Sequence, residues 1–106
     1  MPTLGGTSTS FTLAGKTIHL RDGRLVDADG TLAGAHLSMI DAVRNMIRLT
    51  DVSSADALRM TSTAPARALG LGDELGRITP GFRASLTLLD EVLAVEAVVV
   101  DGQLVD

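Results

Sequence analysis

The residues that could carry chemistry are few and scattered. The 106-residue chain has two histidines, His19 and His36, thirteen carboxylates and no cysteine. Neither histidine has a second histidine or a carboxylate at the spacings of common zinc motifs, and a zinc site needs three or four ligands. We expect His19 to face solvent from a strand and His36 to cap or pack beside a helix start. The sequence therefore predicts no metal site and no catalytic centre within this chain.

Motifs for nucleophiles and phosphate loops are missing in the same way. No serine lies in the Gly-x-Ser-x-Gly turn that presents a serine nucleophile. The run Leu69–Gly72 has neither the spacing of a dinucleotide-binding loop nor the lysine of a phosphate loop. Several aspartates stand where turns are expected, and aspartate in a turn bonds its own backbone: Asp22, Asp27, Asp29 and Asp101.

Composition indicates a folded domain and excludes several kinds of partner. Hydrophobic residues make up 45% and charged residues 21% of the chain, as in an average globular protein. Two phenylalanines, with no tryptophan or tyrosine, argue against base stacking, and the net charge of −4 opposes binding to a phosphate backbone. No apolar run approaches the roughly 20 residues that span a bilayer, and no secretory signal opens the sequence. We therefore expect no nucleic-acid partner, no membrane association and a cytoplasmic location.

The first half of the chain predicts a β hairpin followed by a loop. Glycine, serine and threonine dominate residues 1–10 and predict a flexible lead-in. Apolar residues alternate with polar ones over 11–28, as in a half-buried strand, and Asp22-Gly23 interrupts them as a hairpin turn. Residues 29–37 are predicted to form a loop.

Helical spacing then runs from residue 38 to about residue 70. Ser38 and Ser53 each precede an aspartate by three positions, the pattern of a helix N-cap. Pro65 suits the first turn of a third, short helix, and Gly70 can adopt the left-handed conformation that ends one.

The last third predicts a return to β structure. Pro80-Gly81 fits a type II turn. Residues 84–89 and 95–100 read as strands, the second rich in β-branched residues and expected to be buried on both faces. Asp101-Gly102 predicts another hairpin. The fold class is therefore α+β: a β hairpin, two to three helices, and a second β hairpin, with edge strands that must be covered.

One stretch is more specific than any of these patterns. It reads Asp-Gly-Thr-Leu-Ala-Gly over 29–34, Leu-Ser-Met over 37–39 and Asp-Ala-Val-Arg-Asn over 41–45. This resembles the motif of the N-acetylglucosamine-6-phosphate deacetylases. Later runs resemble a signature shared across the amidohydrolase superfamily: 65–70, 76–81, 84–86 and 99–102. Ala35 stands where the deacetylases usually have serine, and Ser85 where the superfamily often has aspartate.

The resemblance implies the end of a (β/α)8 barrel followed by the C-terminal part of a small β-sandwich. It divides the chain into a lead-in (1–10), a barrel-like region (11–72) and a sandwich tail (73–106). In that family the metal ligands and the catalytic aspartate precede the matched region. The whole enzyme would use a divalent metal, zinc or similar, while this chain would hold no cofactor.

The same resemblance implies a role in amino-sugar metabolism. The whole enzyme would convert N-acetylglucosamine 6-phosphate to glucosamine 6-phosphate and acetate, and we expect this chain alone to be inactive. Leu32, Ala33 and Gly34 match a segment whose backbone contacts the sugar phosphate in the family. We expect that contact only when the missing barrel is present. Otherwise the glycines of this segment simply shape the turn into the helix.

Two other hypotheses stay open at this point. The chain could be a free-standing structural or oligomerisation domain without catalysis, or a fragment of another amidohydrolase such as a dihydroorotase relative. Because strands 84–89 and 95–100 would pair in the family with strands that this chain lacks, we expect a homo-oligomer formed through β edges.

Overall fold

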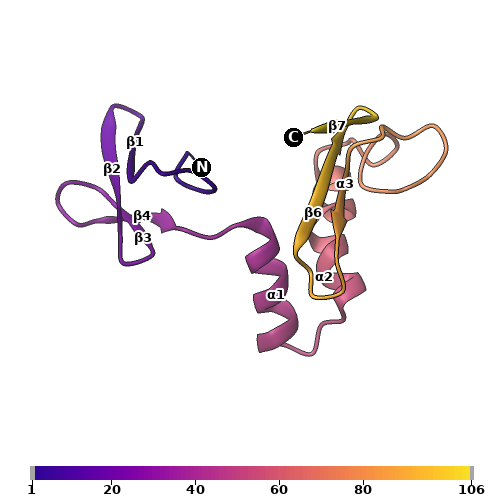
Figure 1. The fold of residues 1–106 in the computed structure, drawn as a ribbon, viewed down its shortest axis with the longest axis horizontal. Helices are drawn as coiled ribbons and strands as arrows, with labels where there is room; N and C mark the ends of the chain where they lie inside the picture. Colours follow the sequence, from indigo (N-terminus) through magenta and orange to yellow (C-terminus); the bar gives the residue numbers. More distant parts are fainter. Residues whose placement is uncertain (1, 106) are drawn as a thin grey trace. The chain divides into compact units, whose positions relative to one another are not determined.

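The computed structural model describes residues 2–105, which divide after Ser38 into two compact units (Figure 1). The first unit holds a four-stranded sheet, and the second holds three helices followed by a three-stranded sheet. The predicted α+β class is confirmed. No helix within these residues is long and apolar enough to cross a membrane.

The first sheet is an antiparallel meander with the strand order β1-β2-β3-β4. Its strands are β1 (Ser10–Leu13), β2 (Lys16–Arg21), β3 (Arg24–Val26) and β4 (Leu32–Ala35). Asp22 and Gly23 take φ values of 49° and 72° between β2 and β3, which confirms the predicted hairpin. Ile18 and Leu25, each 3% exposed, form the apolar centre of this unit.

The prediction of a loop over residues 29–37 is wrong for Leu32–Ala35, which form β4. Leu32, Gly34 and Ala35 pair with β3, although the segment shows no alternation of apolar and polar side chains. Main-chain pairing, rather than side-chain pattern, recruits them into the sheet. The flexible lead-in over 1–10 stays a prediction, but Thr3 is 3% exposed and its carbonyl oxygen accepts a hydrogen bond from His36 Nε2 at 3.1 Å.

The helices of the second unit are α1 (Met39–Leu49), α2 (Ser54–Thr61) and α3 (Thr63–Ala68). The Ser53 hydroxyl accepts the backbone N–H of Asp56 at 3.1 Å, so the predicted N-cap is confirmed. Gly70 has a φ of 73° just beyond α3, as predicted. One buried residue from each helix builds the core: Val43, Ala57 and Ala66.

The second sheet has the order β5-β6-β7, with β5 (Leu86–Leu89), β6 (Val95–Val100) and β7 (Gln103–Val105). The turn before it is closed by the Phe82 N–H, which donates to the Thr79 carbonyl oxygen at 3.1 Å, and this confirms the turn at Pro80-Gly81. Asp101 and Gly102 have φ values of 48° and 82°, as the predicted hairpin requires.

The prediction that residues 95–100 are buried on both faces is wrong for this chain. No residue of β6 is buried, and Val95 and Val100 are each 48% exposed. A strand is buried on both faces only when a layer packs against each face of its sheet. Residues 39–105 do not supply two such layers.

Candidate functional site on strand β4

The three predicted ligand-contacting residues lie together on one short edge strand. Leu32, Ala33 and Gly34 occupy the first three positions of β4, which pairs only with β3. Leu32 is 65% exposed, Ala33 is exposed and Gly34 is half-buried. The strand therefore presents main chain and small side chains to its surroundings.

A β-bulge interrupts β4 at Ala33. Gly34 pairs with Leu25 and Leu32 pairs with Val26, so Ala33 has no partner on β3. The extra residue of a bulge is left out of the ladder, and bulges often stand next to functional sites. Gly34 has a φ of 156°, and a Cβ at its position would lie 3.9 Å from Leu25 Cδ1. The bulge thus takes Ala33 out of the residue-by-residue pairing with β3.

Asp27 holds the turn that leads into this strand. Its Oδ1 atom accepts the backbone N–H of Thr31 at 2.8 Å and that of Asp29 at 3.1 Å. Its own N–H donates to the Thr31 carbonyl oxygen, and Gly30 N–H donates to the Asp27 carbonyl oxygen, each at 3.0 Å. Because Thr31 directly precedes β4, these bonds fix where the strand begins.

The environment of Asp27 favours its ionised form. The hydrogen bond from the Thr31 N–H is the main reason that the pKa of Asp27 lies below its ordinary value, and burial of the side chain opposes it. The Asp29 N–H lowers the pKa further, as does the ammonium group of Lys16, whose Nζ lies 3.8 Å from Asp27 Oδ2. An ionised carboxylate accepts hydrogen bonds but donates none, so Asp27 is an anchor for the backbone and not an acid at neutral pH.

Sequence reasoning identified Asp27 as a turn aspartate, which the structure confirms, but missed its link to the candidate site. The available signal was the spacing: Asp27 stands four residues before Thr31 and five before Leu32. An aspartate that bonds the N–H groups two and four residues ahead sets the start of whatever follows it.

The two histidines do not build a metal site with the carboxylates. His19 is half-buried on β2, where we expected it to face solvent, and His36 donates to the Thr3 carbonyl oxygen. Within residues 2–105, no group of three or more histidine, aspartate or glutamate side chains is placed to hold a metal ion.

A comparison of the sequence with known families matches residues 21–105 to the amidohydrolase family. The match covers most of the chain, including β3, β4, all three helices and the second sheet. The chain belongs to the amidohydrolase family. The resemblance drawn from the motifs at 29–45 and 65–102 is thereby confirmed.

Among its curated relatives are two bacterial deacetylases of sugar phosphates. It is 38% identical over 94 residues to the N-acetylglucosamine-6-phosphate deacetylase of Haemophilus influenzae, covering 89% of this chain and 25% of the relative. It is 45% identical over 94 residues to the N-acetylgalactosamine-6-phosphate deacetylase of Escherichia coli O157:H7, with the same two shares. This amidohydrolase chain thus spans about a quarter of the length of these relatives.

Solved structures show the same fold. The N-acetylglucosamine-6-phosphate deacetylase of Pasteurella multocida superposes with a TM-score of 0.80 at 36% identity, over 92% of this chain and 26% of that one. A variant of the Mycobacterium smegmatis deacetylase, solved in complex with N-acetyl-D-glucosamine-6-phosphate, gives a TM-score of 0.77 at 31% identity. That match covers 98% of this chain and 28% of that chain.

Proposed function

We propose that this chain is the C-terminal part of a metal-dependent sugar-phosphate deacetylase. The whole enzyme would hydrolyse the N-acetyl group of N-acetylglucosamine 6-phosphate and release acetate and glucosamine 6-phosphate. The observation that carries the proposal is the match of nearly the whole chain to one quarter of named deacetylases, in sequence and in fold. In this reading residues 11–72 end a (β/α)8 barrel, residues 73–106 belong to a small β-sandwich, and the enzyme acts in the cytoplasm.

Within that enzyme, β4 would contact the sugar phosphate through its main chain. The bulge at Ala33 releases backbone groups from the ladder, and Gly34 carries no side chain that would keep a ligand away. Asp27 would hold this segment in place through the Thr31 N–H, so it is a positioning residue. The contact is one of binding and orientation, since none of these backbone groups transfers a proton.

The side chains of residues 2–105 do not fit a catalytic metal, because they offer no group of three potential ligands. We therefore assign no chemical step of the hydrolysis to this chain. The metal ligands and the proton-transferring group would come from the remaining three quarters of the enzyme. By itself the chain would be inactive.

A second candidate substrate is supported by one specific observation. The identity of 45% to an N-acetylgalactosamine-6-phosphate deacetylase exceeds the 38% to an N-acetylglucosamine-6-phosphate deacetylase over the same length. The two sugars differ only in the configuration at one carbon of the ring. The reaction class is the same, and only the preferred epimer differs between the two proposals.

A chimeric enzyme tests the proposal. The matched quarter of the Haemophilus influenzae deacetylase is replaced by this chain, and acetate release is measured with both N-acetyl sugar 6-phosphates. We expect turnover of at least one epimer. A folded, metal-loaded chimera that hydrolyses neither would contradict the proposal and favour a non-catalytic structural domain.

The role of β4 is tested in the same chimera. Gly34→Ala places a methyl group on the ligand-facing strand, where its nearest neighbour lies at an ordinary contact distance of 3.9 Å. We expect KM to rise while kcat is retained, the signature of lost binding. Gly81→Ala is the matched control, because Gly81 also has a positive φ and open space around it but lies far along the chain from β4. Equal effects of the two variants would show that β4 has no special role.

A further inference from the structure

Three turns of this protein contain an aspartate directly followed by a glycine: Asp22-Gly23, Asp29-Gly30 and Asp101-Gly102. Such a dipeptide can rearrange without an enzyme, because the glycine nitrogen can reach the side-chain carbonyl carbon of the aspartate, and glycine has no Cβ to hinder the approach. The rearrangement changes the chain itself and is independent of the proposed function. The structure around each glycine nitrogen decides which of the three dipeptides reacts.

The rearrangement closes a five-membered ring and then opens it. The glycine nitrogen forms a bond to the aspartate Cγ atom, while one oxygen of the protonated carboxyl group leaves as water together with the proton of the glycine N–H. Water then adds to one of the two ring carbonyl carbons and breaks its bond to nitrogen, which recovers a proton. Opening at the main-chain carbonyl gives isoaspartate, in which the main chain runs through Cγ. Atoms balance with water alone.

The hydrogen bond of the glycine N–H separates the three dipeptides. Because the nitrogen loses its proton when the ring closes, an N–H that already donates a hydrogen bond must first give up that bond. Gly30 N–H donates to the Asp27 carbonyl oxygen at 3.0 Å, and Gly102 N–H donates to the Ala84 carbonyl oxygen at 2.8 Å. Within residues 2–105, Gly23 N–H donates to no partner. Only this nitrogen is free to react in the folded chain described by the structure.

The two hairpin turns form a matched pair for this comparison. Asp22 and Gly23 have φ values of 49° and 72°, and Asp101 and Gly102 have φ values of 48° and 82°. All four residues are exposed. The second turn is held in addition by the Asp101 N–H, which donates to Ser85 Oγ at 3.3 Å. Sequence, backbone conformation and exposure are therefore alike, and the hydrogen bonds make the difference.

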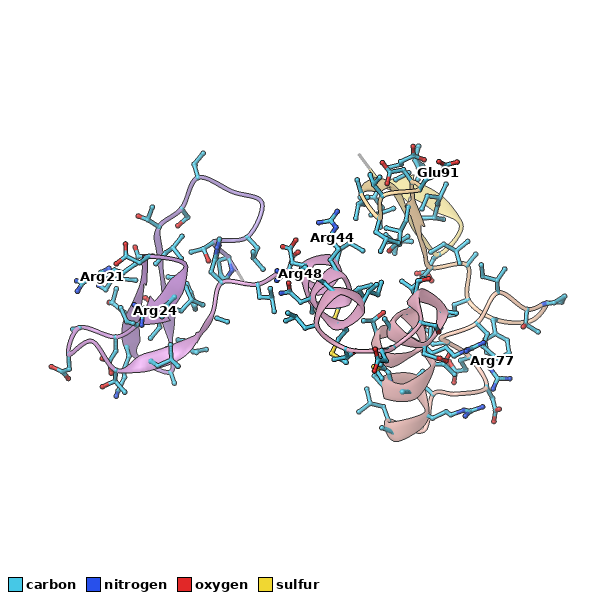
Figure 2. All side chains as sticks on the ribbon, turned by 90° about the horizontal axis from the view of Figure 1, so that it is seen from below. Arg21, Arg24, Arg44, Arg48, Arg77 and Glu91 are labelled. Carbon is cyan, nitrogen blue, oxygen red and sulfur yellow. The ribbon has the colours of Figure 1, made fainter. Side chains whose placement is uncertain are left out.

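The residues that close the two hairpins differ in charge. Arg21 lies opposite Arg24 at the end of the β2–β3 hairpin, and both are exposed (Figure 2). The β6–β7 hairpin closes with Val100 opposite Gln103. Like charges directly opposite each other destabilise a strand pair. The first turn therefore opens more easily than the second and reaches the geometry of ring closure more often.

We propose that Asp22-Gly23 is a self-modification site of this protein, at which the folded chain forms isoaspartate faster than at its other two aspartate–glycine dipeptides. The free Gly23 nitrogen is the nucleophile and the Asp22 carboxyl group is the electrophile. The arginine pair beside the turn loosens it, and no metal, oxidant or partner protein takes part.

The modification would reach strand β4. Isoaspartate adds one methylene group to the main chain of the turn, which displaces the neighbouring Gly23 carbonyl oxygen. This oxygen accepts the His36 N–H at 3.3 Å, directly after β4, and Arg24 pairs with Ala35 at the end of β4. We expect the His36 amide of modified molecules to exchange with solvent faster than that of unmodified ones.

Ageing of the purified 106-residue chain tests the proposal. The chain is incubated in mildly acidic buffer and digested with an endoproteinase that cleaves before aspartate but not before isoaspartate, and mass spectrometry measures the uncleaved sites. We expect at least about fivefold more isoaspartate at Asp22 than at Asp29 or Asp101, because a hydrogen bond must be broken at the other two. Equal amounts, or more at either of the other positions, would overturn the proposal.

Ageing in concentrated urea separates the effect of the fold from that of the sequence. Unfolding removes the hydrogen bonds of Gly30 and Gly102 and the arginine pairing beside Gly23, so we expect the three dipeptides to react at similar rates. If Asp22 leads by the same factor in urea, its sequence neighbours set the rate and the proposal is overturned.

Two asparagine variants give a faster readout of the same comparison. Asp22→Asn and Asp101→Asn keep a residue that suits a tight hairpin turn, and ring closure then releases ammonia instead of water. Each variant reports its own glycine nitrogen through the mass gained on deamidation. We expect the folded Asp22→Asn chain to deamidate at this position at least about fivefold faster than the folded Asp101→Asn chain does at its own. Equal rates in the two variants would overturn the proposal.

Discussion

Two loops of this protein, one in each unit, share the same hydrogen bonds around an aspartate. In the first, Asp27 Oδ1 accepts the N–H groups two and four residues ahead, at 3.1 and 2.8 Å. In the second, Asp90 Oδ1 accepts the N–H groups of Val92 and Ala94, at 2.9 and 2.7 Å. In both loops the aspartate N–H donates to the carbonyl oxygen of the residue four positions ahead. The residue three positions ahead, Gly30 in the first loop and Leu93 in the second, donates its N–H to the aspartate carbonyl oxygen.

The loops differ at this residue three positions after the aspartate. The first loop has Gly30 at a φ of 80°, and the second has Leu93 at a φ of 62°. A left-handed conformation costs a residue with a Cβ roughly 1–2 kcal/mol, so the second loop is strained and the first is not. In the second loop the Leu93 carbonyl oxygen accepts a bond from Arg44 Nη2 of α1 at 2.6 Å. The aspartate therefore defines both loops, while a glycine in the first and a hydrogen bond from outside in the second make the left-handed conformation tolerable.

The largest effect should come from removing an aspartate. Asp90→Ala deletes the acceptor of two backbone N–H groups, and we expect a loss of about 2 kcal/mol in the free energy of unfolding. The same change at Asp27 should release the start of β4 and expose the Thr31 and Gly34 amides to hydrogen exchange. Urea unfolding and exchange measured by NMR check both variants. Retained protection of the Thr31 amide in Asp27→Ala would contradict the assigned role.

Substitutions at Gly30 and Leu93 should show how much backbone strain each loop carries. Gly30→Ala places a Cβ at positive φ in open space, so the expected cost is about 1 kcal/mol from backbone strain alone. Leu93→Gly relieves strain but removes a half-buried side chain, and we expect a net change below about 1 kcal/mol. Thermal unfolding measures the loss of stability in each of the two variants. An equal loss in both would show that Leu93 is not strained.

Removing the outside hydrogen bond should destabilise the second loop only. Arg44 also pairs with Asp41 at 3.0 Å and is partly exposed, so we expect Arg44→Gln to cost about 1 kcal/mol. The exposed Arg48 of the same helix donates to Asn45 Oδ1 at 3.1 Å, and Arg48→Gln is the matched control with no expected loss (Figure 2). If the two variants unfold at the same urea concentration, the bond to Leu93 contributes nothing.

The smallest expected effect is that of pH on Asp27, because this carboxyl stays ionised at neutral pH. Its pKa is lower in the folded chain than the value of about 3.9 in an unfolded one, so its contribution is complete above the unfolded value. That contribution is lost as the pH falls through the lower, folded value. We expect the Thr31 amide shift to be constant from pH 8 to about pH 5 and to move only in more acidic solution. In Asp27→Asn that acidic transition should be absent, and its persistence would assign it to another group.

The parts of the fold that follow local rules could be predicted from the sequence. Asp22-Gly23 and Asp101-Gly102 supply the positive φ values that tight hairpins need, and Ser53 supplies an oxygen for a helix N-terminus. The turn at Ala14-Gly15 was not predicted, because alanine rarely adopts a φ of 49°. Pairing of β1 with β2 imposes that value on it.

The parts that depend on tertiary pairing could not be predicted. Leu32–Ala35 have no alternating pattern, so only the approach of β3 reveals them as a strand. Family resemblance pointed to Leu32, Ala33 and Gly34, but their contact with a sugar phosphate stays a proposal. The bulge at Ala33 and the hydrogen bonds of Asp27 could not be predicted either, because both depend on which backbone groups meet in space.

Acetate release by the purified 106-residue chain, measured with N-acetylglucosamine 6-phosphate and zinc chloride, tests whether this chain can act without the rest of the enzyme. We expect no release above that of zinc alone, because residues 2–105 hold no set of side chains that could bind the metal. Acetate release that rises with the concentration of the chain, requires zinc and disappears in His19→Ala or His36→Ala would contradict it.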